Sequence, residues 1–283
     1  MFPAPLDNAP PATRMAYRLA VAVALVLWLI PLAAVLMTSV RSLEDINLGN
    51  YWGWPRRWLL VENYSAVFTT TAMGTFLVNS LLIAVPSVLG AILLSSMAGF
   101  ALAKYRFRGN VALFALFTAG NFIPFQILMI PVRRLTIGLG LYDSIFGLVA
   151  FHIAFQSGFC TLFMRNFIKA LPDAMLEAAR IDGATEAQLF WRVVLPQMRP
   201  ALAALAVLVF TFVWNDYFWA LVLSQTDAVR PVTAGLQSLK GMWVASWQLV
   251  SAGAIIAALL PASLFFLLQR QFIAGLTLGA LKE

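Results

Sequence analysis

The sequence predicts an all-α integral membrane protein with six transmembrane helices. Of its 283 residues, 61% are hydrophobic and only 11% are charged, whereas ordinary soluble domains carry roughly a quarter charged residues. The mean hydropathy is +0.85. A soluble core of this size could not bury so much apolar surface, so lipid is the expected surrounding. The formal charge of +7 fits cytoplasmic loops of a membrane protein and does not call for a nucleic-acid partner.

Six long intervals with at most one charged residue set the expected spans. A bilayer-spanning helix needs about 20 mainly apolar residues. Helices are expected because lipid offers the backbone no hydrogen-bonding partners, and the alternation of barrel strands is absent. The intervals are 19–40, a stretch within 63–103, 110–132, 144–164, 200 to about 224 with Asp216 inside it, and the second half of 241–269.

The first interval is expected to be a retained span. Arg14 and Arg18 precede it, as in a secretory signal, but its length exceeds the roughly 7–15 residues of a signal core. Residues 1–16 are expected to form a cytoplasmic leader whose proline-rich part, 2–13, is disordered. The transmembrane domain is expected over 17–270, and a cytoplasmic tail over 271–283.

The distribution of basic residues predicts the orientation. Six crossings place both termini on one side, which then holds 12 of the Lys and Arg residues against 7 on the other. The positive-inside bias therefore places both termini in the cytoplasm. Arg133 and Arg134 fall on the outer side, against this bias.

The outer loops are rich in tryptophan. The segment 41–71 contains Trp52, Trp54 and Trp58, which suit the headgroup layer as anchors, with a ligand site as the alternative. A second outer loop spans 225–247 and holds Trp243 and Trp247.

The inside loop 165–199 is predicted to form a soluble helical hairpin. It carries nine charged residues, five basic and four acidic, among helix-forming residues. Pro172 is expected at the first helical position, and Glu177 is spaced to pair with Arg180 on the same helix. Ala178 and Ala179 keep this helix thin enough to enter a groove on a partner.

A sharp corner is expected in the middle of this loop. Asp182 and Gly183 end the first helix, because glycine tolerates the left-handed conformation that commonly closes one. Thr185 and Gln188 form a capping-box pattern that starts the second helix, which runs on to Pro196.

The loop resembles a known signature. In order it reads Glu177, Ala178, Ala179, three residues, Gly183, nine residues, Val193, one residue, Leu195 and Pro196. This pattern resembles the EAA signature of permease subunits of bacterial ABC importers, with valine replacing the usual isoleucine. Four further segments are similar to MalG-like permeases of the maltose type: 101–109 (ALAKYRFRG), 124–132 (PFQILMIPV), 214–223 with its WND, and 272–282 (FIAGLTLGALK), after which Glu283 replaces a common glycine.

The resemblance implies a multi-pass permease of the bacterial inner membrane whose hairpin is a coupling helix docked on a cytoplasmic ATPase dimer. An amphipathic hairpin on the membrane surface is the alternative. ATP and Mg²⁺ would be bound by the ATPase, and this chain would hold no cofactor. The other implied partners are a MalF-like second permease and a periplasmic or extracellular sugar-binding protein. Loop 225–247 would reach the sugar-binding protein, with a turn on the membrane surface as the alternative. The coupling residues implied are Glu177, Ala178, Ala179, Asp182, Gly183, Leu195 and Pro196.

Other functional classes lack the residues they need. Cys160 and His152 are the sole cysteine and histidine, so a disulfide or a soft metal site is not expected. No lysine follows a glycine, which excludes a P-loop, and no Gly-x-Ser-x-Gly is present for a membrane-embedded hydrolase. A secondary carrier would bring charges into several spans, but Asp216 alone lies well inside one.

Polar residues within the spans are candidates for the solute pathway. Asp216 and Asn215 would suit sugar hydroxyls, since a carboxylate facing lipid is unfavourable. Asn121 and Gln126 flank Pro124, where a bend could line a cavity. Structural hydrogen bonding is an equal alternative for all four, and the carried solute stays open among monosaccharides, oligosaccharides, polyols and glycerol-phosphates. His152 and Gln156 are expected to pack as a pair at four-residue spacing.

Overall fold

The computed structural model describes residues 9–239 and 246–280, and every regular element within them is helical. The chain divides into two compact units. The first runs to residue 71 and includes 239–256. It holds α1 (Pro11–Ser39), α2 (Leu43–Asn47), α3 (Leu60–Thr69) and the first turns of α14 (Trp247–Ala280).

The long apolar helix α1 begins earlier than expected. It starts at Pro11, within the leader expected to be disordered, because proline fits the first helical position, where no amide partner is required. At its other end, Asn63 of α3 donates hydrogen bonds to the carbonyls of Ser39 (2.9 Å) and Arg41 (2.8 Å). The bond to Ser39 satisfies one of the acceptors that a helix end leaves unpaired, and the bond to Arg41 fixes the segment that follows.

The second unit comprises 72–238 and 257–283 and contains most of the elements. In chain order these are α4 (Met73–Lys104), α5 (Asn110–Gly120), η2 (Phe125–Leu128), α6 (Met129–Gly138), α7 (Ile145–Lys169), α8 (Asp173–Ile181), α9 (Glu186–Gln188), the π-helical η3 (Leu189–Val194), α10 (Leu195–Gln197), α11 (Arg199–Trp214), α12 (Phe218–Leu223), α13 (Val232–Ser238) and the remainder of α14.

Helices α4 and α7 pack closely and form the centre of this unit. Small residues recur along the buried side of α4, at Ser87, Ala91, Ser95 and Gly99. A β-carbon at Gly99 would lie 2.9 Å from the Arg165 amide nitrogen of α7, and Ser95 Oγ donates to the Ser157 carbonyl at 3.3 Å. Small residues let two helix backbones approach where lipid supplies no hydrophobic drive.

Within residues 9–239 and 246–280, four helices are long and apolar enough to cross a bilayer, namely Pro11–Ser39, Met73–Lys104, Ile145–Lys169 and Trp247–Gln269. Two bent helix pairs pass the same test of length and composition: Asn110–Gly120 with Phe125–Gly138, bent by 93°, and Glu186–Gln197 with Arg199–Trp214, bent by 77°. The expected number of six spans is reached if each bent pair is one span, and it stays a prediction.

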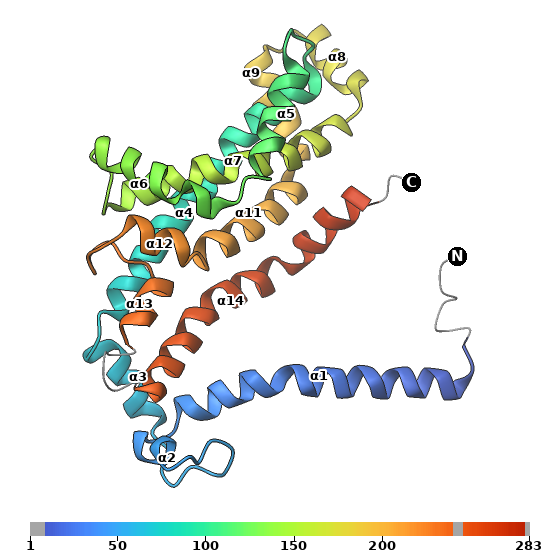
Figure 1. Cartoon of the computed structure of the whole chain (residues 1–283). Helices are drawn as coiled ribbons and strands as arrows, with labels where there is room; N and C mark the ends of the chain where they lie inside the picture. Colours follow the sequence, from blue (N-terminus) through green and yellow to red (C-terminus); the bar gives the residue numbers. More distant parts are fainter. Residues whose placement is uncertain (1–8, 240–245, 281–283) are drawn as a thin grey trace. The chain divides into compact units, whose positions relative to one another are not determined.

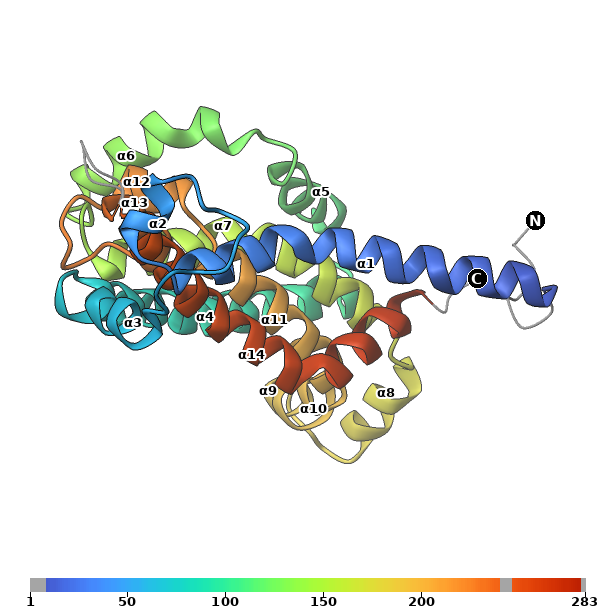
Figure 2. The same cartoon turned by 90° about the horizontal axis from the view of Figure 1, so that it is seen from below.

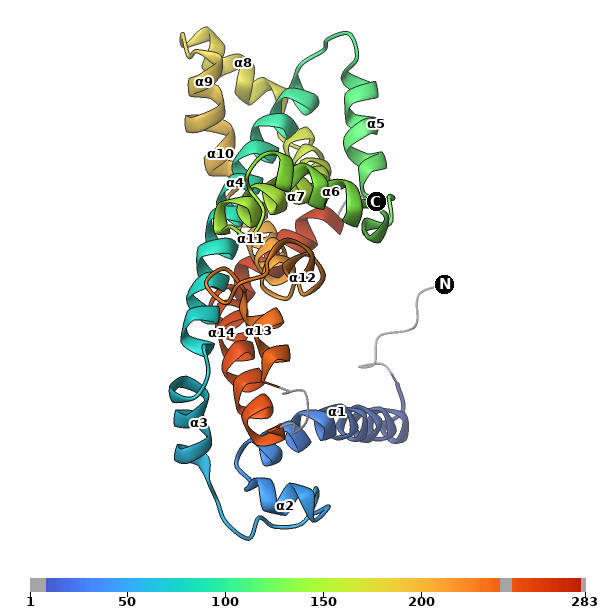
Figure 3. The same ribbon diagram turned by 60° about the vertical axis from the view of Figure 1, so that its left-hand side comes forward.

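Two expected spans are interrupted. The interval 110–132 bends sharply around Pro124, and Figure 3 shows α5 and α6 running in different directions from this point. The interval 200–224 is divided into α11 and α12, so Asp216 lies in the turn between two helices and not within one. In both places a side chain replaces hydrogen bonds that the helix backbone loses: Asn121 donates to the Phe117 carbonyl at the first break, and Asp216 accepts from backbone amides at the second.

Candidate functional site

The hairpin, defined as residues 173–197, has the predicted corner. Gly183 has φ +84°, the left-handed conformation in which glycine is favoured. Thr185 Oγ1 accepts from the Gln188 amide at 3.3 Å, and Gln188 Oε1 accepts from the Thr185 amide at 2.8 Å, which completes the capping box. Pro172 precedes α8 as its N-cap, one position before the expected one.

An ion pair across the corner was not anticipated. Arg180 donates to both carboxylate oxygens of Glu186, at 2.9 and 3.2 Å. The expected pairing of Arg180 with Glu177 is therefore wrong, because the turn at Gly183 brings the start of α9 back against α8. Hydrogen bonds from Arg180 and then Tyr105 lower the pKa of the Glu186 carboxyl, while the bond to Glu186 raises that of Arg180.

Helix α8 has one buried and one exposed side. Leu176 is buried, whereas Glu177, Ala178, Asp182 and Gly183 are exposed and Ala179 is partly exposed. Ile181 is the large apolar residue on the exposed side, at 85% of its surface. Sequence reasoning missed Ile181, although an apolar residue three positions after Ala178 on an otherwise polar surface was a usable signal.

The second arm of the hairpin is largely framework. Leu189, Phe190 and Val194 of η3 are buried, and Leu195 and Pro196 are half-buried. Figure 2 shows α8, α9 and α10 gathered into one compact corner. The residues expected to couple therefore fall into an exposed group on and after α8 and a packing group at the start of α10.

Asp216 and Asn215 hold the ends of two helices. Asp216 accepts hydrogen bonds from the amides of Trp219 and Ala220, both at 3.2 Å, and so caps α12. Asn215 is exposed and its amide group donates to the Thr211 carbonyl of α11 at 2.9 Å. The carboxylate of Asp216 also lies 3.6 Å from His152 Nε2. The buried His152 thus faces Asp216, and Gln156 is buried on the same helix.

Asn121 and Gln126 lie near a different cavity. This cavity has a volume of about 910 Å³, and its mainly apolar lining from α5, α6, α7 and α11 includes Asn121, Thr136 and Gln156. Asn121 also donates to the Phe117 carbonyl at 2.9 Å, closing α5. Gln126 is exposed nearby on η2. The four pathway candidates are thus divided between two locations.

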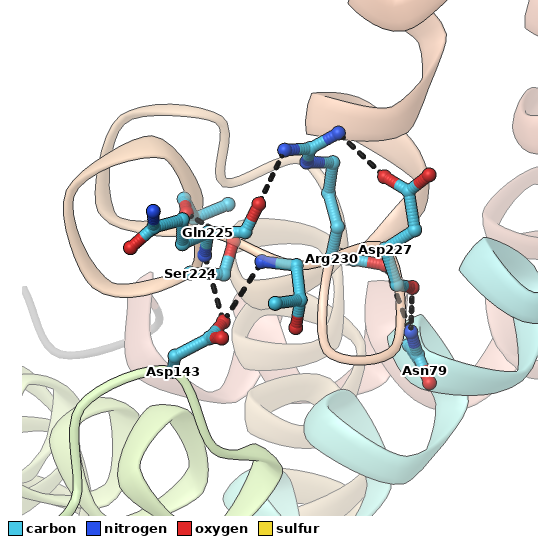
Figure 4. Close-up of polar contacts among 8 residues, drawn as sticks. Asn79, Asp143, Ser224, Gln225, Asp227 and Arg230 are labelled. Carbon is cyan, nitrogen blue, oxygen red and sulfur yellow. Dashed lines mark hydrogen bonds and ion pairs between the residues drawn. The ribbon is translucent and has the colours of Figure 1, made fainter.

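The loop 224–231 is fixed by side chains from other elements (Figure 4). Asp143, before α7, accepts from the amides of Gln225 (2.7 Å) and Thr226 (3.1 Å). Asn79 of α4 donates to the carbonyls of Asp227 (3.2 Å) and Arg230 (3.0 Å). This first part of the expected outer loop 225–247 is therefore a defined structure, while residues 240–245 lie outside the described ones.

Two closely packed helices of bilayer length, α4 and α7, together with an exposed helical corner are the architecture of a membrane transport subunit. The chain belongs to the family of binding-protein-dependent transport system inner membrane components, whose model matches residues 91–277. The family confirms the prediction of a permease subunit of an ABC transporter, which is its non-catalytic membrane component.

Individual relatives match over most of the chain. The osmoprotective compounds uptake permease protein GgtD of Synechocystis is 36% identical over 91% of this chain and 88% of its own. The arabinooligosaccharides transport system permease protein AraQ of Halalkalibacterium halodurans is 35% identical over 79% of this chain and 80% of its own. A crystal structure of a bacterial ABC transporter involved in the import of alginate shares the fold, with a TM-score of 0.79, 22% identity, and coverage of 96% of this chain and 99% of that one.

Proposed function

We propose that the chain imports a sugar or sugar-like solute across the inner membrane, with both termini and the hairpin in the cytoplasm. The names of its relatives, which include an arabinooligosaccharide permease and an osmoprotectant permease, support this solute class. The basic residues concentrated on the hairpin's side of the membrane support the orientation.

The hairpin is proposed to couple transport to a separate ATPase dimer, which would bind ATP and Mg²⁺. The observation that carries this proposal is the exposed side of α8, where Ala178 and Ile181 lead into the glycine corner. Small residues beside one prominent apolar side chain suit a helix that enters a groove. The exposed surface that enters the groove would be bounded by Glu177, Asp182 and the corner at Gly183. The half-buried Leu195 and Pro196 would pack within the hairpin and stabilise this surface.

A crosslink tests the coupling role. Cys160 is buried, so a cysteine introduced as Ala178→Cys is the accessible thiol for a short crosslinker in native membranes. We expect a crosslinked product containing an ATP-hydrolysing subunit, and loss of that product when Ile181→Asp is added. The matched control is Ala187→Asp on α9, which should leave the product intact. Crosslinks to lipid alone would contradict the proposal and favour a self-contained carrier.

The remaining partners follow from the same assembly. A second, MalF-like permease would complete the membrane unit, and the 225–247 loop would meet a sugar-binding protein outside. Asn121 and Gln126 are proposed to line the solute pathway. Asn121 lies in the lining of the 910 Å³ cavity, and Gln126 is exposed on the neighbouring η2.

Asp216, with Asn215, is proposed to shape the solute pathway by holding α11 and α12. Asparagine can also cap a helix, so Asp216→Asn should preserve thermal stability. A fall in arabinooligosaccharide-stimulated ATPase activity at unchanged stability would indicate a direct contact with solute. Full stimulated activity would leave Asp216 only its capping role.

A further inference from the structure

The segment ALAKYRFRG, 101–109, has no role in the coupling proposal, yet two of its side chains contact the hairpin. It contains the end of α4 and the residues that follow. In Figure 1, α8 and α9 lie at this end of α4. Lys104 and Tyr105 are the residues that reach them.

Lys104 joins three elements with one ammonium group. Its side chain is only 5% exposed, and its Nζ donates to the Leu171 carbonyl and to Asp173 Oδ1, both at 2.7 Å. Leu171 lies in the turn after α7, and Asp173 is the first residue of α8. The bond to Lys104 lowers the pKa of the Asp173 carboxyl. Exposed ion pairs contribute little to stability, but the bond from the buried Lys104 ammonium to the Leu171 carbonyl is costly to break.

Tyr105 reaches the other arm. Its Oη donates to Glu186 Oε2, the carboxylate that also binds Arg180 across the corner. Burial, followed by the neighbouring Glu186, raises the pKa of the Tyr105 hydroxyl, so it stays a donor at neutral pH. The Tyr105 ring packs edge-on against Phe100 at 5.3 Å, and Phe100 lies 5.7 Å from Phe190 of η3.

The end of α4 is itself held in place. Asn110 donates to the Tyr105 carbonyl at 2.9 Å and to that of Leu102 at 3.3 Å. The hairpin is therefore attached to α4 at both arms, with Lys104 on the α8 arm and Tyr105 on the α9 arm.

We propose that Lys104 and Tyr105 are positioning residues that clamp the hairpin to α4. A displacement of the hairpin by the ATPase then moves α4 as one body with it, and moves α7 through the close α4–α7 contact. The inference rests on the proposed coupling function for its consequence, although the clamp itself is a property of this chain.

Spin-label distances in the assembled transporter test the clamp. Labels at Leu94→Cys on α4 and Ala187→Cys on α9 occupy exposed positions. In the parent chain, we expect the same distance distribution without nucleotide and with ATP and vanadate. In the Lys104→Met, Tyr105→Phe double variant, a second population should appear, with the detached fraction raised roughly tenfold.

Arg108→Met is the matched control, because it removes an exposed cation four residues after Lys104. It should reproduce the parent distances, and Lys104→Arg should restore most of the single population. A shift of the parent distance on trapping, or an unchanged distribution in the double variant, would overturn the clamp. Failure to recover an ATPase with the parent chain would refute the coupling proposal instead, and the nucleotide-free distances would still test the clamp.

Discussion

Gly183 offers a quantitative test of the hairpin corner, since its surroundings isolate one physical effect. Its φ is +84°, and a β-carbon added there would meet nothing within 4 Å. A substitution therefore introduces backbone strain without a steric clash within the chain. For an ordinary L-residue the left-handed conformation costs roughly 1–2 kcal/mol, which corresponds to about a 5- to 30-fold change in an equilibrium constant.

The expected order of variants follows from that strain. Gly183→Asn should behave almost as the parent, because asparagine visits the left-handed region readily. For the chain in nanodiscs, Gly183→Ala should raise the dissociation constant of the co-purifying ATPase, at most by the factor of about 5 to 30 that the strain allows. Gly183→Val should raise it by at least as much. Insertion into the membrane should be unchanged in all three.

The control is Gly120→Ala, where the surroundings are equally open and no positive φ is required. It should leave ATPase binding as in the parent. The reasoning fails if alanine at 183 binds as tightly as glycine, or if asparagine there is as weak as valine, since neither result is compatible with strain as the cause.

Three further predictions concern packing, the fixed loop and pH. Gly99→Val should lower the thermal stability of the detergent-solubilised chain by roughly 1–3 kcal/mol, because its side chain would push α4 away from the α7 backbone, whereas Gly120→Ala should not. Asn79→Ala leaves two carbonyls of the 224–231 loop unpaired, at a cost of ~1–3 kcal/mol, and should speed hydrogen exchange there; unchanged exchange would show that Asp143 suffices. The Glu186 carboxyl has a pKa below its ordinary 4.5. Its ion pair with Arg180 therefore contributes its full stabilisation of the hairpin above pH 4.5, and this stabilisation is lost as the pH falls through the lowered pKa. The spin-label distance between 94 and 187 should therefore be constant near neutral pH and broaden only below 4.5. Glu186→Gln should remove the part of this transition that arises at the α9 arm and leave the part that arises at Asp173, whose pKa is also lowered.

Local patterns in the sequence were sufficient for the corner of the hairpin. Gly183 and the Thr185–Gln188 capping box act over three or four residues, so their geometry depends on the adjacent backbone alone. The spans could also be predicted from the sequence, because a helix that crosses a bilayer needs a minimum length and must pair its backbone groups internally. The family signature in the hairpin is a pattern of this local kind.

Contacts between segments far apart in the chain could not be predicted from local sequence patterns. Arg180 has acidic residues at several local spacings, and the reversal of the chain at the corner decides that Glu186 is its partner. Asp216 was read as a charge within a span, but the division of α11 from α12 makes it a cap, and it faces His152 of another helix.

By itself, the sequence determined an all-helical membrane permease with an exposed, glycine-cornered hairpin, because hydropathy, charge and capping are read within one segment at a time. Only the tertiary structure decided which side of α8 is exposed, and that Lys104 and Tyr105 bind the hairpin. Those features depend on contacts between residues about 70 to 80 positions apart, and side-chain spacing along the chain carries no information about such distances.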